Sequence, residues 1–386
     1  MNNLPLSGIR IVDFSWVMAG PMTTKMLGAM GAEIIKIESS TRPEFSVRDG
    51  MFSVINNNKR SCTLNITTPA GQDLIRELVA SSNVVVENFS SRVLEQYGLS
   101  YSRLREVKPD IIYVSASGMG RTGPERDLLA YGSLLQGYSG RVGMIGTPNP
   151  ALEAMGILPA WTDPITALWE TVAILTALRH RRETGQGAYI DLSMLEATVA
   201  LLPEALLHAA LGEDVPERRS TTEPGASPSG CFRCAGEDDW LAVSVRTDEE
   251  WRGLCRVANF TDAAASMDTA SRLKAKDELN AKLAAWLRTQ SAPAIESALH
   301  ANAVPASRSR NMSELVADAH MQQRAMFSDI DGTVEMATLP WLAADKWRGA
   351  FSPTPPIGRD NDYVFGTLLG LSSERRAELA EAGTIR

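Results

Sequence analysis

The sequence predicts an α/β protein with a large, doubly wound parallel sheet and a smaller α+β unit. Two observations carry this prediction. Short apolar runs alternate with helical segments over residues 9–118, and repeated strand–helix–strand units favour a parallel sheet with helices on both faces. Residues 213–230 are rich in Pro, Gly, Ser and charge, as is typical of a linker. The pattern after them is that of a smaller α+β unit.

The elements of the first half follow from apolar runs and helix-start signals. Residues 19–32 predict a helix with small residues on one side. Residues 68–82 predict an amphipathic helix, with Thr68 as N-cap and Pro69 at the first helical position. The predicted strands are 9–15, 33–38, 61–66, 83–89 and 110–118.

A long helix is predicted from about residue 164 to 182, and a strand follows it at 188–194. Basic residues fill the last turn of this helix, where they complement the negative end of its dipole. After the linker, residues 231–245 have the pattern of a hairpin. Three more helices are predicted there, at 247–258, 270–289 and 291–301.

Composition argues against several functional classes. The 386 residues carry a formal charge of −8 without a block of basic residues, so nucleic acid and membranes are not expected partners. Four cysteines are too few for a disulfide scaffold. The single CxxC at 231–234 lacks the further ligands of a zinc site, so no metal is expected. No credible signal peptide begins the sequence, and we expect a cytoplasmic protein.

Asp163 is the most suggestive carboxylate. The dinucleotide motif GxGxxG does not follow the first strand, GxSxG is absent, and the four histidines form no evident catalytic set. Asp163 precedes Pro164 at the start of the long helix. A helix cap there contributes about 0.5–2 kcal/mol, whereas an ionised carboxylate at a helix start can also attack an electrophile. The residues alone favour the cap and leave both roles open.

Four long stretches carry a resemblance to a known family. They are "LSGIRIVDFSWVMAGPMTTKMLGAMGAEIIKIE", "NNNKRSCTLNITTPAGQDLIRELVASSNVVVENF", "LEQYGLSYSRLREVKPDIIYVSASGMGRTGP" and "DPITALWETVAILTALRHRRETGQGAYIDLSMLEA". These stretches resemble the class III CoA-transferases (CaiB/BaiF type), which include formyl-CoA and carnitine CoA-transferases and the related α-methylacyl-CoA racemases. They occur in the order and spacing of that family and span most of the chain.

The resemblance implies an interlocked homodimer whose Rossmann-like large domain is built from both ends of each chain. On this chain, the large CoA-binding domain is expected at 1–205, with a C-terminal return at 326–386. Residues 206–230 are the expected linker, and 231–325 the small α+β domain.

The resemblance also places the family's catalytic Asp on Asp163. The implied reaction moves CoA from an acyl-CoA donor to a small carboxylic acid through an aspartyl mixed anhydride and an aspartyl-CoA thioester. CoA and acyl-CoA are then substrates, and no permanently bound cofactor is expected.

The implied CoA contacts follow the strands of the first half. They are Val17, Met18 and Ala19, Leu64, and Asn88 with Phe89. Lys59 and Arg60 are a candidate phosphate-binding pair, with a solvated basic pair as the alternative. Where the family can have an Arg after "KIE", this sequence has Ser39, with Arg42 nearby as the candidate.

Three functions remain open. In racemases of this family, a His in a "GHD" motif and the Asp are the two groups that remove and return the α-proton. Here Tyr131 stands at the position of that His, and no His precedes residue 180. Loss of that base disfavours two-base proton exchange. A CoA-transferase is therefore favoured over an α-methylacyl-CoA racemase or epimerase. A non-catalytic CoA-binding protein is the third alternative.

Overall fold

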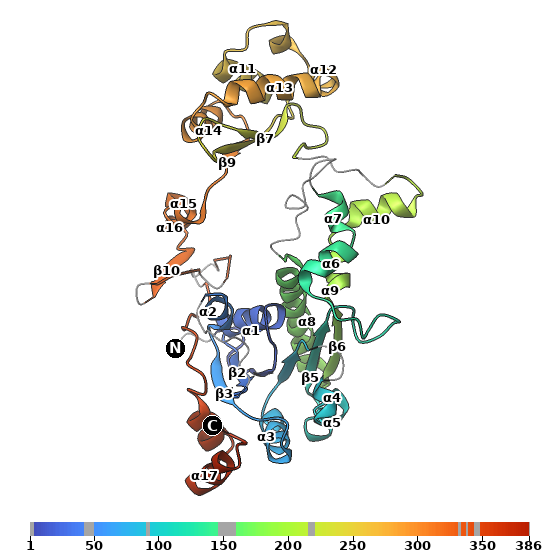
Figure 1. Cartoon of the computed structure of the whole chain (residues 1–386), viewed down its shortest axis with the longest axis vertical. Helices are drawn as coiled ribbons and strands as arrows, with labels where there is room; N and C mark the ends of the chain where they lie inside the picture. The colour runs from blue at the N-terminus through green and yellow to red at the C-terminus, as the bar shows by residue number, and fades with distance from the viewer. Residues whose placement is uncertain are drawn as a thin grey trace. The chain divides into compact units, whose positions relative to one another are not determined.

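The computed structural model describes residues 4–41, 50–89, 93–145, 160–214, 221–330, 333–336, 339–342 and 348–385. It divides into two compact units (Figure 1). The first comprises 1–141, 157–204 and 322–386, and so contains both ends of the chain. The second comprises 142–156 and 205–321.

A six-stranded, parallel sheet forms the centre of the first unit, which confirms the predicted doubly wound α/β class. The strand order is β3-β2-β1-β4-β5-β6, so the direction of winding reverses between β1 and β4. The strands are β1 (Arg10–Asp13), β2 (Glu33–Glu38), β3 (Arg60–Thr63), β4 (Val84–Glu87), β5 (Ile112–Ser117) and β6 (Ala188–Ser193).

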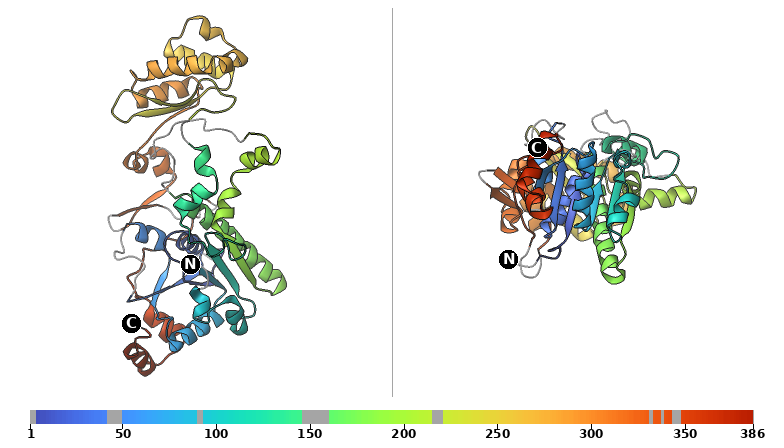
Figure 2. Two further views of the ribbon diagram at one scale, coloured as in Figure 1. Left: turned by 45° about the vertical axis from the view of Figure 1, so that its right-hand side comes forward. Right: turned by 90° about the horizontal axis from the view of Figure 1, so that it is seen from below.

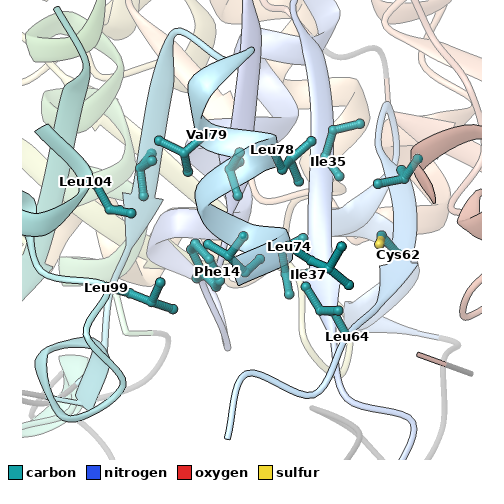
Figure 3. Packing of buried hydrophobic residues seen from close by; sticks show 14 of the residues in the cluster. Phe14, Ile35, Ile37, Cys62, Leu64, Leu74, Leu78, Val79, Leu99 and Leu104 are labelled. Carbon is teal, nitrogen blue, oxygen red and sulfur yellow. The ribbon is translucent and has the colours of Figure 1, made fainter. Parts of the chain in front are cut away.

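Each face of this sheet packs into its own core. Alternate residues of β4 show the division: Val84 and Val86 join the core of α1 (Ala19–Ala29) and α8 (Thr162–Thr184), whereas Val85 joins that of α3 (Pro69–Ala80) and α5 (Tyr101–Val107). Figure 3 shows side chains of the second core, in which α3 contributes Leu74, Leu78 and Val79. Because β4 packs into a core on both faces, it is buried along its whole length, which explains its run of three Val residues.

The C-terminal segment completes this second core. Leu379 of α17 (Ser373–Glu381) is buried in it, and Leu64 pairs with Ile385 in an isolated bridge. In both views of Figure 2, the red C-terminal helices accordingly lie next to blue segments from the N-terminal part of the chain. The remaining elements of the first unit are α2 (Met51–Asn56), α4 (Val93–Gln96), α6 (Gly132–Tyr138), α9 (Met194–Val199), β10 (Phe327–Ile330), β11 (Thr333–Met336) and η3 (Asp362–Leu368). Three further helices cross the boundaries of this unit, namely α7 (Arg141–Met144), α10 (Pro203–Ala210) and α16 (Ala319–Gln323).

The second unit packs helices on a three-stranded sheet. Strands β7 (Ser229–Arg233) and β8 (Trp240–Ser244) form the predicted hairpin, and β9 (Ala306–Arg308) pairs with β8. The helix predicted at 270–289 is instead two helices, because the backbone of Ala275 leaves the helical conformation, with φ −94° and ψ 20°. The helices are α11 (Asp248–Ala258), η2 (Ala263–Ser266), α12 (Thr269–Lys274), α13 (Lys276–Leu287), α14 (Ala292–Ala301) and α15 (Met312–Val316).

Local signals account for several helix boundaries. Thr68 caps α3 as predicted, because its hydroxyl accepts a hydrogen bond from the Gly71 amide at 3.1 Å. The first helix ends at Ala29, three residues earlier than predicted, and Gly31 follows with a positive φ of 101°. Within the described ranges, no helix has the length and apolarity needed to cross a membrane.

Candidate active site

The carboxyl ends of β1 and β4 lie side by side where the strand order reverses. In open α/β sheets, the crevice at such a reversal is the usual place for a ligand. The predicted CoA contacts Val17, Met18 and Ala19 follow β1, and Asn88 and Phe89 follow β4. The fold therefore brings five of the predicted contacts to one edge of the sheet.

Asn88 joins the two segments directly. Its Oδ1 accepts a hydrogen bond from the Trp16 amide at 2.7 Å, and its Nδ2 donates to the Trp16 carbonyl at 2.8 Å. The rings of Trp16 and Phe89 meet edge to face, with centroids 5.9 Å apart. Gly20, at the start of α1, leaves room for the Ser15 side chain, because a Cβ there would lie 2.3 Å from the Ser15 Cβ. One side chain thus sets the geometry of both loops.

Val17 has an unusual backbone conformation in the first of these segments. Its φ is +67° and its side chain is exposed. A β-branched residue is strained in this left-handed region, and such strain persists where the surrounding structure enforces it, often at functional sites. The strain supports the assignment of this segment to a binding site.

The ion pair between Glu87 and Arg121 holds the backbone of Phe89 in place. The Phe89 amide donates to Glu87 Oε2 at 3.0 Å, and its carbonyl accepts from Arg121 Nη2 at 3.0 Å. Arg121 Nη2 also lies 2.7 Å from Glu87 Oε1. Burial raises the pKa of Glu87, and the charge of Arg121 opposes that rise. Sequence analysis missed Arg121, whose role depends on a carboxylate 34 positions earlier.

Asp163 lies in the first turn of α8, and the predicted cap is wrong. The helix begins at Thr162, with Trp161 in the N-cap position. The Trp161 amide donates to Oε1 of the buried Gln136, at 3.1 Å. This contact from α6 anchors the start of α8 and shifts it two residues ahead of the predicted Pro164. Nothing in the local sequence signals the role of Gln136.

The carboxylate of Asp163 is partly exposed and has few partners. Among the described residues, its hydrogen-bond partner is its own backbone. Burial raises the pKa of Asp163 to about 6. Its Oδ2 lies against Gly132, the first residue of α6, where a Cβ would be 1.9 Å from that oxygen. Among the described residues no cation pairs with this carboxylate, so its oxygens are available for nucleophilic attack.

The start of α1 belongs to the same neighbourhood. Ala19 is buried in a small apolar cluster with Leu135 of α6 and Met194 of α9. On α9, the hydroxyl of Thr198 donates to Thr162 Oγ1 at 3.2 Å. The helix that carries Asp163 and the loop after β1 are therefore attached to common elements.

Lys59 and Arg60 do not form a solvated basic pair, because Lys59 is buried and Arg60 alone is partly exposed. The Nζ of Lys59 lies 3.0 Å from Asp13 Oδ2 and 2.9 Å from Asn56 Oδ1. Arg60 pairs with Glu33 and with Asp360. Both cations have carboxylate partners within the fold, which argues against a phosphate-binding role.

The remaining predicted contacts lie apart from Asn88. Leu64 is buried in the core beneath α3, so its side chain is not available to a ligand. Arg42 lies outside the described residues. In the ranges that the structure describes, no group of three His, Cys, Asp or Glu side chains is placed to hold a metal ion.

Comparison with known proteins identifies the family. A sequence model described as CoA-transferase family III matches residues 6–361. The succinate–glutarate CoA-transferase of Agrobacterium fabrum is 32% identical, over 94% of this chain and 96% of its own. The succinyl-CoA:mesaconate CoA-transferase of Haloarcula marismortui is 31% identical, over 84% and 85%.

A solved structure agrees with these matches. A CaiB/BaiF family protein from Brucella suis superimposes with a TM-score of 0.86 at 26% identity, covering 95% of this chain and 100% of its own. The fold and the sequence thus agree over nearly the whole length. The chain belongs to CoA-transferase family III and is a CoA-transferase.

Proposed function

We propose that this enzyme transfers CoA between carboxylic acids by covalent catalysis at Asp163. The observation that carries the proposal is the state of that carboxylate: it is partly exposed at the start of α8, and its recorded hydrogen bond is with its own backbone. The positive end of the helix dipole favours the ionised form that attacks, while partial burial keeps it weakly solvated.

The reaction is a series of acyl substitutions. An oxygen of Asp163 attacks the thioester carbonyl of the donor, and the CoA thiolate leaves as the mixed anhydride forms. The thiolate then attacks the aspartyl carbonyl, which releases the donor acid and leaves an aspartyl-CoA thioester. The acceptor carboxylate attacks the aspartyl carbonyl of this thioester, expels the CoA thiolate and forms a second anhydride. The thiolate then attacks the acceptor's acyl carbonyl, which gives the new acyl-CoA and releases the Asp163 carboxylate. One thioester replaces another, so no further energy source is needed.

CoA is proposed to bind across the crevice formed by the loops after β1 and β4. Asn88 and the Glu87–Arg121 ion pair hold the backbone of these loops. A rigid binding surface reduces the entropic cost of ordering the ligand. Val17, Met18 and Phe89 then supply contacts to CoA, and the transferred acyl group reaches Asp163.

Dicarboxylic acids are the proposed substrates. The relatives above are named for succinate, glutarate and mesaconate, all of which keep a second carboxylate after one end is activated. Arg141 Nη1 donates to Gln136 Oε1 at 2.9 Å, and that oxygen also binds the Trp161 amide beside Asp163. No carboxylate of the described residues pairs with Arg141. Its guanidinium suits the distal carboxylate of such a substrate.

Racemisation fits the site less well. It requires a second base opposite Asp163, but the position occupied by His in the related racemases is Tyr131, whose side chain is exposed at the N-cap of α6. A phenol is a poor general base near neutral pH. A purely CoA-binding protein would not need a reactive carboxylate at this place.

The decisive experiment supplies succinyl-CoA and a panel of mono- and dicarboxylic acids, and follows acyl-CoA products by mass spectrometry. Asp163→Asn and Asp163→Ser keep residues that suit a helix start but lack the nucleophile, so both are expected to abolish transfer. Hydroxylamine added during turnover should leave a hydroxamate on Asp163. Undiminished transfer by Asp163→Asn would overturn the mechanism. Solvent deuterium at the substrate α-carbon without transfer would indicate a racemase.

A homodimer is proposed as the working form. Large apolar side chains remain exposed on two neighbouring helices of the single chain, namely Leu134 and Tyr138 of α6 and Leu168, Trp169 and Val172 of α8. Apolar clusters of this kind mark interaction surfaces. Light scattering on the purified protein should give twice the mass of the chain, 41.9 kDa, and a monomer would contradict the proposal.

A further inference from the structure

We infer that Gly132 is a positioning residue that sets the orientation of the Asp163 carboxylate. This inference rests on the proposed role of Asp163 as the nucleophile. It concerns a contact between α6 and α8 within the first unit, and a residue that neither contacts CoA nor reacts.

The contact leaves no room for a side chain at residue 132. A Cβ built on Gly132 would lie 1.9 Å from Asp163 Oδ2, 3.1 Å from Asp163 Cγ and 3.2 Å from Ala160 Cβ. Since Cβ atoms do not approach other heavy atoms within 3.0 Å, any residue other than Gly must displace the carboxylate. Gly132 itself is buried, so the backbone of α6 covers this side of Asp163.

Backbone conformation does not explain this glycine. Gly132 is the first residue of α6, and its φ lies outside the left-handed region that favours Gly. Within a helix, Gly is less stable than Ala by about 0.5–1 kcal/mol. Gly137, on the same helix, has open space where its Cβ would be. The two glycines therefore lie on the same helix, but only Gly132 has a neighbour that leaves no space for a side chain.

The contact matters because it determines where Oδ2 can lie. Asp163 is the second residue of α8, so no preceding helical turn restricts its χ1 rotamer, and the backbone of α6 at Gly132 is what the carboxylate packs against. A Cβ at residue 132 removes the observed position of Oδ2, so Asp163 must turn toward solvent or α8 must move. Misplacement of a reacting group by about 1 Å can cost about 100-fold in rate.

The test compares Gly132→Ala with Gly137→Ala in the full-length enzyme. Gly132→Ala is expected to lower kcat about 100-fold, with little change in the KM for acyl-CoA, and to slow hydroxamate formation at Asp163 equally. The acidic limb of its pH–rate profile should move below that of the wild type, because a displaced carboxylate is better solvated. Gly137→Ala should match the wild type in all three. Equal kinetics and equal pH limbs in the two variants would overturn the inference.

A stability cycle tests the same contact without activity. Gly132→Ala should lower Tm more when Asp163 is present than in an Asp163→Ala background, because the second substitution removes the clashing carboxylate. If the single variant fails to fold, recovery of folding in the double variant supports the contact. Equal losses in both backgrounds contradict it. Asp163→Asn decides the proposed mechanism separately, since it leaves Gly132 unchanged.

Discussion

Asn88 binds both backbone groups of Trp16, at 2.7 and 2.8 Å, and so links the loops that follow β1 and β4. An amide is the side chain that can donate and accept at once in this geometry. Asn83 stands at the other end of β4, where its Oδ1 accepts from the Arg10 amide at 2.8 Å. Two asparagines thus join the same pair of strands at opposite ends.

This symmetry provides a matched test of the CoA crevice. Asn88→Asp keeps the acceptor but loses the donor, and it brings a carboxylate oxygen against the Trp16 carbonyl. The KM for acyl-CoA should rise about 10-fold, in keeping with a hydrogen bond of about 1 kcal/mol and the cost of an unsatisfied partner. Asn83→Asp retains its recorded acceptor contact and should leave this KM unchanged. Equal effects of the two substitutions in steady-state kinetics would place the CoA site elsewhere.

Lys59 should matter for stability and not for CoA binding. Asp13 and Lys59 are 0% and 1% exposed. Burial opposes ionisation of Asp13, but Lys59 and Lys36 outweigh it and lower its pKa. Lys59→Met leaves this buried carboxylate short of a partner and should cost about 3–5 kcal/mol in the free energy of unfolding measured with urea.

Arg60→Met is the control for that substitution. The Arg60 side chain is 41% exposed, and surface ion pairs contribute about 0–1 kcal/mol, so its loss should be small. A stable Lys59→Met enzyme with a raised KM for acyl-CoA would restore the phosphate-binding role suggested by the sequence.

The contrast between Thr68 and Lys59 shows what the sequence could reveal. Thr68 caps α3 through a contact with a residue only three positions away, so the local sequence predicts it. The buried strands are likewise predicted, because their apolar residues are consecutive in the sequence. Lys59 pairs with Asp13, 46 positions away, and nothing near either residue signals the other. The start of α8 was misplaced for the same reason, because Gln136 binds it from 25 positions earlier. Family resemblance located Asp163, whereas its contact with Gly132 required the fold.

Glu170 should make the fold less stable as the pH rises. It is fully buried on α8, and burial raises its pKa to about 8 from an ordinary value of 4.5. Between these values the folded protein holds a proton that the unfolded chain releases, so unfolding becomes easier with increasing pH. Glu170→Gln removes this proton, and its stability relative to the wild type should increase from pH 5 to pH 8. If the urea midpoints of Glu170→Gln and the wild type differ by the same amount at pH 5 and at pH 8, Glu170 is not protonated in the folded protein and the prediction is wrong.

Asp163 should give the activity an acidic limb. Because its pKa is raised to about 6 and the nucleophile must be ionised, kcat/KM should fall as the pH is lowered through about 6. This parameter reports groups of the free enzyme. Rates of hydroxamate formation at Asp163 should follow the same curve. A limb below pH 4 would show that the carboxylate is solvated before CoA binds.

Arg141 should distinguish dicarboxylic from monocarboxylic acids. Burial lowers its pKa, but the guanidinium remains charged near neutral pH. Arg141→Gln removes the proposed partner of a distal carboxylate, and truncating one member of such a pair costs about 2–5 kcal/mol. The KM for dicarboxylic acceptors should therefore rise at least 10-fold, with that for monocarboxylic acids of equal length unchanged. Arg126→Gln is the control, since Arg126 pairs with Asp127 on an exposed loop. If Arg141→Gln raises the KM for dicarboxylic and monocarboxylic acceptors equally, Arg141 supports the start of α8 through Gln136 and does not select the substrate.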